Sequence, residues 1–114
     1  MPVVKLTTTG RKSHKPRDTM LTTPVHDAGK VVLVASAGGA DRHPSWYLNL
    51  RQDPNVTVTM NGHRQSMIAR TASADERAQL WPEILKVYKG YGDYEQKADR
   101  EIPVVILESA GPPT

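Results

Sequence analysis

The sequence predicts an α+β fold: a small, mainly β barrel with inserted helices. Its 114 residues, of which 38% are hydrophobic and 24% charged, suit one globular domain. Six segments have the composition or the alternation of β-strands, and two or three helical segments interrupt their order. We expect a single domain over residues 1–110 and a disordered tail over residues 111–114.

The first part of the chain predicts strands separated by turns. Three segments rich in β-branched residues predict the first strands: Val3–Thr8, Thr19–Val25 and Val31–Ala35. Gly10–Pro16 has the glycine, serine and proline content of a loop. A turn over Asp27–Lys30 predicts that the second and third strands form a hairpin.

The middle of the chain predicts a helix followed by a second hairpin. Pro44–Arg51 is expected to be helical, because proline suits a first helical turn, and it has to end before Pro54. Val56–Met60 alternates apolar and threonine residues as a half-buried strand does. Asn61-Gly62 is a strong hairpin dipeptide and predicts a returning strand over Ser66–Ala72.

The last part predicts a capped helix and a buried strand. Ser73 and Glu76 have capping-box spacing. The helix that follows is expected to bury one stripe, namely Ala78, Trp81, Leu85 and Tyr88. Pro82 predicts a kink or a restart in this helix.

Glycines and an apolar segment predict where the long helix ends and where the last strand lies. Gly90 and Gly92 are predicted to end the long helix, with a short helical turn over Asp93–Asp99. Ile102–Leu107 is apolar at every position except Pro103, which is typical of a strand buried on both faces in the centre of a sheet.

Positive charge is concentrated near the N-terminus. Residues 1–20 contain five cationic side chains and one acidic one, whereas the remainder contains ten and eleven. The cations are Lys5, Arg11, Lys12, Lys15 and Arg17. A local patch of this kind can hold an anion, a nucleic-acid backbone or an acidic lipid surface, or it can simply be solvated.

Several chemistries lack the residues that they need. The chain has no cysteine, so disulfides, thiolate nucleophiles and thiolate metal sites are excluded. Its four histidines show no metal-binding spacing, and we expect no metal. No serine stands in a G-x-S-x-G motif, and Gly10-Arg11-Lys12-Ser13 lacks the earlier glycine of a phosphate-binding P-loop.

The aromatic residues occur in two groups, and all have polar atoms. Trp46-Tyr47 forms one group, and Trp81, Tyr88, Tyr91 and Tyr94 form the other. Such side chains suit a planar ligand with hydrogen-bonding edges. Trp81 fits a place in the core, whereas Tyr91 and Tyr94 beside glycines suit a core role and a ligand role equally.

Three blocks of sequence follow one another in a recognisable order: LTTTGRKSHKPR at 6–17, VVLVASAGG at 31–39 and HPSWYLNLRQDPNVTV at 43–58. With DERAQLWPEILKVYKGYGDY and the final IPVVIL, the chain resembles the deazaflavin-dependent nitroreductase family of actinobacteria over nearly its whole length. The P-x-WY-x-NL-x-x-x-P block is the most specific part. The resemblance implies a flavin-reductase-like split β-barrel and reduced coenzyme F420, a 5-deazaflavin, as hydride donor.

The resemblance also implies site residues. Those expected to bind the cofactor are Arg11, Lys12, Ser13, Arg17, Met20, Ser36, Ala37, Gly38, Gly39, Pro44, Trp46 and Asn49. Those expected to bind the substrate are Thr22, Tyr88, Tyr91 and Tyr94. Arg11, Lys12 and Arg17 would hold the phosphate and carboxylates of the cofactor tail. Tyr91 or Ser36 would be catalytic by hydrogen bonding charge that develops on the acceptor. Relatives commonly have glycine, proline and lysine where this chain has His14, Met20 and Ala37.

The implied activity is hydride transfer to a planar, electron-poor acceptor such as a quinone, a nitroaromatic or an unsaturated ring compound. The alternative from the residues is a split barrel that binds flavin mononucleotide (FMN), whose phosphate the basic turn would also hold. A third hypothesis, single-stranded nucleic-acid binding, is disfavoured because the cations form no long track.

We therefore expect a small-molecule substrate, no nucleic-acid partner and a monomer or homodimer. No apolar run reaches the ~20 residues that span a bilayer, so a cytoplasmic protein is expected. Relatives carry a further segment before the first strand. Contact with the inner face of the membrane is expected only through such a segment.

Overall fold

The computed structural model describes residues 2–27, 29–36, 42–97 and 101–110. Their elements in chain order are β1 (Val3–Thr9), β2 (Pro16–Thr22), β3 (Val25–Asp27), β4 (Lys30–Val34), α1 (Ser45–Gln52), β5 (Asn55–Met60), β6 (His63–Thr71), α2 (Ala74–Val87), α3 (Gly90–Lys97) and β7 (Val104–Ser109). The expected tail, residues 111–114, lies outside the described residues.

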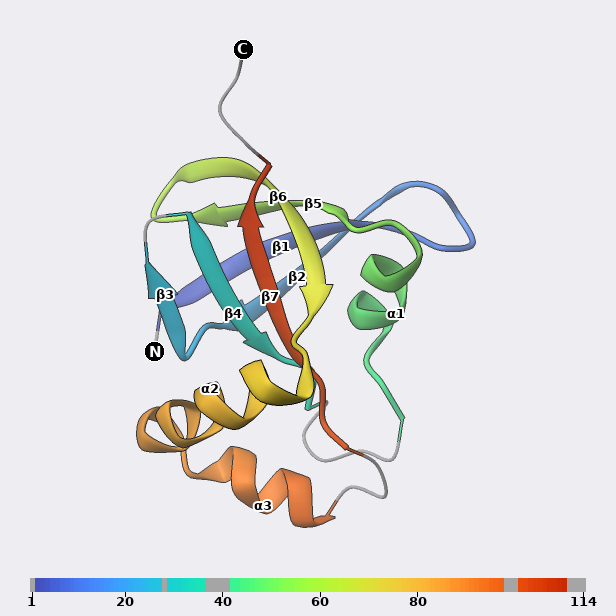
Figure 1. The fold of residues 1–114 in the computed structure, drawn as a ribbon. Helices are drawn as coiled ribbons and strands as arrows, with labels where there is room; N and C mark the ends of the chain where they lie inside the picture. The colour runs from blue at the N-terminus through green and yellow to red at the C-terminus, as the bar shows by residue number, and fades with distance from the viewer. Residues whose placement is uncertain (1, 28, 37–41, 98–100, 111–114) are drawn as a thin grey trace.

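The strands form one curved sheet in the order β2-β1-β5-β6-β7-β4-β3 (Figure 1). Its two edge strands, β2 and β3, are consecutive in the chain and are separated by Thr23 and Pro24 alone. The buried Thr23 hydroxyl lies 2.9 Å from the Val25 carbonyl and 2.8 Å from the Val32 carbonyl, and its one proton is shared between these two acceptors. The chain therefore passes from one edge of the sheet directly to the other and closes part of the barrel wall.

This crossing corrects the strand that was predicted over Thr19–Val25. The segment is divided between β2, which pairs with β1, and β3, which pairs with β4. The predicted hairpin is therefore right only for β3 and β4, where Asp27 pairs with Lys30. Local composition could not show the division, because both halves have strand-forming residues and differ only in their partners.

Two apolar clusters stabilise the sheet on its two sides. One fills the concave side under α1, and the other lies between the opposite side and the helices α2 and α3. Strand β7 contributes to both clusters, and its residues from Val104 to Leu107 are buried. This confirms the prediction of a strand buried on both faces and inside the sheet. The predicted mainly β class with inserted helices is confirmed as well.

The predicted turn and cap signals are confirmed. Asn61 and Gly62 both have positive φ, as a type I′ hairpin requires, and they join the paired residues Met60 and His63. At the start of α2, the Ser73 hydroxyl accepts from the Glu76 amide, and the Glu76 carboxylate accepts from the Ser73 amide.

The helices after this cap differ from the prediction. Pro82 lies inside α2 without a restart. Gly90 begins α3 and Gly92 lies within it, so these glycines do not mark the end of helical structure. The buried stripe of α2 is shifted, because Ile84 is fully buried whereas Ala78 and Tyr88 are exposed. Trp81 and Leu85 pack against the second cluster, as expected.

None of the described helices is both long and apolar enough to cross a membrane. Figure 1 shows α2 and α3 together on one side of the sheet and α1 near the β1–β2 loop. The two places where function was expected therefore lie at α1 and at α3.

Candidate active site

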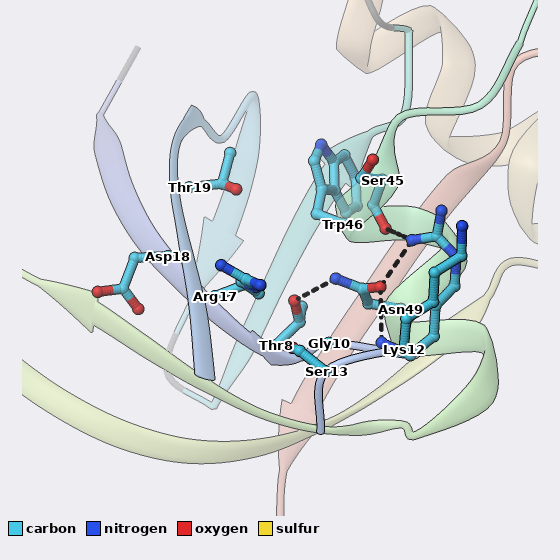
Figure 2. A pocket seen from close by; sticks show the side chains of 11 residues that line it. Thr8, Gly10, Lys12, Ser13, Arg17, Asp18, Thr19, Ser45, Trp46 and Asn49 are labelled. Carbon is cyan, nitrogen blue, oxygen red and sulfur yellow. Dashed lines mark hydrogen bonds between the residues drawn. The ribbon is translucent and has the colours of Figure 1, made fainter. Parts of the chain in front are cut away.

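A cavity of about 390 Å³ lies between the β1–β2 loop and α1 (Figure 2). It is lined by Thr8, Gly10, Arg11, Lys12, Ser13, Arg17, Asp18, Thr19, Ser45, Trp46 and Asn49. Arg17 stands opposite the buried Thr8 in the β1–β2 register, so the two residues share the inner face of the sheet. We call this the cationic cavity.

A tight turn forms the rim of the cationic cavity. The Gly10 amide donates to the Lys15 carbonyl at 2.8 Å, and the His14 amide donates to the Gly10 carbonyl at 2.8 Å. A Cβ on Gly10 would lie 2.4 Å from the Ser13 hydroxyl oxygen, so a larger residue would displace Ser13. His14 adopts φ 58, a conformation in which residues other than glycine are uncommon.

Asn49 of α1 fixes Arg11 in place. Its side-chain oxygen accepts from the Arg11 guanidinium at 2.8 Å and from the Arg11 amide at 3.2 Å. Its side-chain nitrogen donates to the Thr8 hydroxyl at 3.2 Å (Figure 2). Asn49 is 5% exposed and Arg11 is half-buried, so the network is partly shielded from water. One cation of the cavity is therefore held in position before any ligand arrives.

The cations of the β1–β2 loop and of the start of β2 have no carboxylate partner among the described residues. Arg11, Lys12, Lys15 and Arg17 form no ion pair there. The nearest acid in sequence, Asp18, accepts from the Thr7 hydroxyl at 2.7 Å and points away from Arg17 (Figure 2). Asp18 lines the same cavity as Arg11, Lys12 and Arg17, but it pairs with none of them, so the lining keeps an excess of positive charge that favours an anion.

A second cavity of about 210 Å³ lies where the barrel is open between β2 and β4. It is lined by Leu21, Thr22, Leu33, Val34, Ser36, Trp46 and Tyr91. The opening exists because β3 pairs with β4 only as far as Val32, so Leu33 and Val34 lack a partner on that edge. We call this the slot.

Tyr91 of α3 lies at the slot between β2 and the other two tyrosines. It is 6% exposed, and its hydroxyl is 3.4 Å from the Thr22 hydroxyl. The Tyr91 ring contacts the edge of the Tyr88 ring, with centroids 5.0 Å apart. The hydroxyls of Tyr88 and Tyr94 are 3.1 Å apart, and this hydrogen bond raises the pKa of Tyr88. Tyr88 therefore stays protonated and can act only as a neutral hydrogen-bonding group near neutral pH.

Trp46 lines both cavities. It is a buried residue of the first turn of α1, and the rest of its helix packs through Tyr47 and Leu50 on the concave core. The cationic cavity and the slot are therefore neighbours around one indole. A long ligand with an anionic tail and a flat head fits this arrangement, with the tail near Arg11 and the head near Trp46.

The structure brings together most of the residues that were predicted for the cofactor. Arg11, Lys12, Ser13, Arg17, Trp46 and Asn49 line the cationic cavity, and Ser36 lines the slot. Pro44 caps α1 without lining either cavity. Met20 is 63% exposed, lies opposite Lys5 on the outer face and reaches neither cavity. The predicted Ala37, Gly38 and Gly39 lie outside the described residues.

Of the four predicted substrate residues, two line the slot and two do not. Thr22 and Tyr91 line the slot, whereas Tyr88 and Tyr94 support Tyr91 from behind without lining it. The sequence reasoning missed several lining residues, namely Thr8, Gly10, Asp18, Thr19, Ser45, Leu21, Leu33 and Val34. The alternation Val4, Leu6, Thr8 along β1 could have shown that Thr8 points inward.

No three His, Asp or Glu side chains in the described part of the chain are grouped so that they could hold a metal ion. The cationic cavity is lined by guanidinium, ammonium, hydroxyl and amide groups and by one carboxylate, that of Asp18. Their chemistry suits phosphate and carboxylate oxygens rather than a cation.

The fold and the two cavities define a split-barrel protein with a site that suits an anionic ligand with a flat ring. The model of the F420H(2)-dependent quinone reductase family matches residues 1–109. The F420H(2)-dependent quinone reductase Rv1261c of Mycobacterium tuberculosis is 35% identical over 109 residues, which cover 93% of this chain and 72% of that protein. The chain belongs to the F420H(2)-dependent quinone reductase family.

Solved structures agree with this assignment. A structure described as an F420-H2 dependent reductase (FDR-A) has a TM-score of 0.83 and 41% identity, and the match covers 94% of each chain. Another, described as a domain-swapped dimer, has a TM-score of 0.84 and 41% identity over 94% of this chain and 80% of that one. The predicted recognition, the split-barrel fold and the class of F420H2-dependent reductase are confirmed. The family's cofactor is coenzyme F420, and the FMN alternative is not supported.

Proposed function

We propose that this protein transfers a hydride from reduced coenzyme F420 to a quinone held in the slot. The observation that carries the proposal is that Trp46 lines both the cationic cavity and the slot. A cofactor whose tail lies among Arg11, Lys12 and Arg17 would then have its ring beside the slot. When bound, the reduced deazaflavin supplies the hydride.

The cations would bind and orient the anionic tail of the cofactor, and burial of its ring would add binding free energy. A hydrogen bond to a charged group contributes about 1.5–3 kcal/mol, so three cations give a gross ~4.5–9 kcal/mol. A micromolar dissociation constant needs about 8 kcal/mol after an association cost of ~4–15 kcal/mol. Burial of the ring against Trp46 therefore has to contribute, which makes both parts of the site necessary.

The residues of the slot have a separate part in the reaction. Reduction of a quinone to a quinol consumes one hydride and one proton, and one quinone oxygen becomes negatively charged if the proton arrives later. The Tyr91 hydroxyl, now 3.4 Å from the Thr22 hydroxyl, can turn to donate to this oxygen. Ser36, which is 8% exposed, offers a second hydroxyl in the same slot.

The same geometry extends the proposed acceptors beyond quinones. Leu33, Val34 and Trp46 give the slot flat or apolar walls, and its hydroxyls can donate hydrogen bonds to a negatively charged oxygen of another planar, electron-poor molecule. Nitroaromatic and unsaturated ring compounds share these properties. We include them in the proposal as slower or alternative acceptors.

The direct test is oxidation of reduced F420 by the purified protein, followed by absorbance with menadione as acceptor. We expect turnover with menadione. Parallel assays with a nitroimidazole and with cyclohexenone as acceptor determine how broad the acceptor class is. Tyr91→Phe should lower kcat/KM for menadione about tenfold, because one hydrogen bond to developing charge is lost, while F420 binding stays within twofold. Absence of F420H2 oxidation with every acceptor would refute the proposed activity.

We further propose that the protein acts in the cytoplasm as a monomer or a homodimer, with no nucleic-acid partner. The solved relative described as a domain-swapped dimer supports the homodimer. Light scattering after size-exclusion chromatography would decide between the two states.

A further inference from the structure

The side chain of Arg77 joins three segments of the chain on the α2 and α3 side of the sheet. Its Nε donates to the Ile102 carbonyl at 3.1 Å, just before β7. Its Nη2 forms an ion pair with Glu95 of α3 at 2.5 Å, and its Nε lies 3.3 Å from the Glu101 carboxylate. The guanidinium also lies over the Trp81 ring, 4.4 Å from the centroid.

Arg77 is the better shielded of the two arginines that form ion pairs in the described part of the chain. Its side chain is 17% exposed, whereas that of Arg70 is 44% exposed. An ion pair that is partly removed from water is screened less than one on the surface, and a planar guanidinium fixes direction as well as distance. The contact with Glu95 therefore constrains α3, whereas Glu101 at 75% exposure is held loosely.

Glu95 transmits this constraint to the slot, because it lies four residues after Tyr91. Residues at this spacing lie on the same face of a helix, one turn apart. Helix α3 also approaches α2 closely at Gly92, since a Cβ there would lie 3.3 Å from a methyl carbon of Leu85. A shift of α3 along α2 would therefore move the Tyr91 hydroxyl relative to Thr22.

We propose that Arg77 is a positioning residue, which holds the Tyr91 hydroxyl at the slot through its ion pair with Glu95. The inference rests on the proposed function, because it assigns Tyr91 to the acceptor. It separates the acceptor part of the site from the cofactor part, whose cations lie on the β1–β2 loop and at the start of β2. Loosening of α3 should impair use of the acceptor and leave cofactor binding intact.

Two variants provide a matched test, because each removes one carboxylate partner of the same arginine. Glu95→Gln breaks the link to α3, whereas Glu101→Gln changes a partner outside that helix. We expect Glu95→Gln to raise KM for menadione roughly five- to tenfold and to leave the dissociation constant of F420 within twofold. Glu101→Gln should leave both constants within twofold.

A double-mutant cycle tests whether the effect passes through Tyr91. If it does, Glu95→Gln added to Tyr91→Phe lowers kcat/KM by less than twofold further, since the hydroxyl is already absent. A full additional loss in the double variant would overturn the inference, because Glu95 would then act by another route.

Amide hydrogen exchange of the protein without cofactor gives a readout that does not depend on activity. In Glu95→Gln the amides of α3 should exchange about tenfold faster, with those of α1 unchanged, and Glu101→Gln should leave both helices unchanged. If α3 exchanges faster in Glu95→Gln and the wild-type protein oxidises no F420H2, the constraint on α3 is supported and the proposed function is refuted. Unchanged exchange and unchanged KM in Glu95→Gln would overturn the positioning role of Arg77.

Discussion

The arginines of this protein differ in what surrounds them. Arg70 donates to both carboxylate oxygens of Glu76, at 2.7 and 2.8 Å, and to Glu108 at 2.9 Å. Arg77 has a comparable set of partners on α3 and before β7. Arg11 and Arg17 have no carboxylate partner in the described part of the chain and line a cavity.

The comparison separates structural cations from binding cations. Arg70 and Arg77 lie where three segments meet, and their charge is neutralised by glutamates from neighbouring elements. The loop cations repel one another unless an anion is present, and Asn49 holds Arg11 without neutralising it. These cations are held in place, but no carboxylate pairs with them. They are therefore expected to contribute to ligand binding more than to the stability of the fold.

The largest effect is expected from removing two cations of the cavity. Lys12→Ala/Arg17→Ala should raise the dissociation constant of F420 about 100-fold or more, because each lost charge-assisted contact costs about 1.5–3 kcal/mol. Titration of F420 monitored by tryptophan fluorescence measures it. Arg70→Ala is the matched control and should leave the constant within twofold. Equal constants for the wild type and the double variant would place the anion elsewhere.

A smaller effect, on stability, is expected at the paired arginine. The hydrogen bond from Arg70, together with the Ser73 amide, lowers the pKa of Glu76 from 4.5 to about 2. Because the pKa is lower in the folded protein, the ionised carboxylate stabilises the fold above about pH 4.5, and this contribution disappears as the pH falls towards 2. Glu76→Gln should therefore lower Tm at pH 7, and the difference from wild type should shrink below pH 4.

Thermal unfolding between pH 2.5 and 7 checks this dependence. Glu83→Gln is a suitable control, since Glu83 is exposed on the same helix and forms no ion pair within the described residues. A Glu76→Gln difference that stays constant with pH would show that the carboxylate contributes through packing or capping rather than through its charge.

The smallest effect is expected in the turn that carries the cations. His14 has φ 58, where a Cβ costs free energy that glycine avoids, although glycine also gains entropy in the unfolded chain. His14→Gly should therefore raise the free energy of unfolding by less than about 1 kcal/mol. Urea unfolding measures this, with His63→Gly as the control in a strand. A clear loss of stability in His14→Gly would mean that the imidazole itself stabilises the turn.

Elements defined by short-range patterns could be predicted from the sequence. The Asn61-Gly62 hairpin, the Ser73–Glu76 capping box and the apolar strand before Glu108 depend on residues close in the chain. The cationic cluster could be predicted for the same reason. The α3 helix was misjudged because glycine is a weak helix former, and its packing against Leu85 compensates only in the folded protein.

The sequence by itself determined the class of fold, the turns and the segment that carries the unpaired cations. Only the tertiary structure decided that Thr23 divides one extended segment between opposite edges of the sheet, and that Asn49 holds Arg11 from 38 residues away. It also decided that Trp46 borders both cavities. The physical reason is that propensities and spacing act along the chain, whereas strand partners and shared cavities depend on which distant segments pack together.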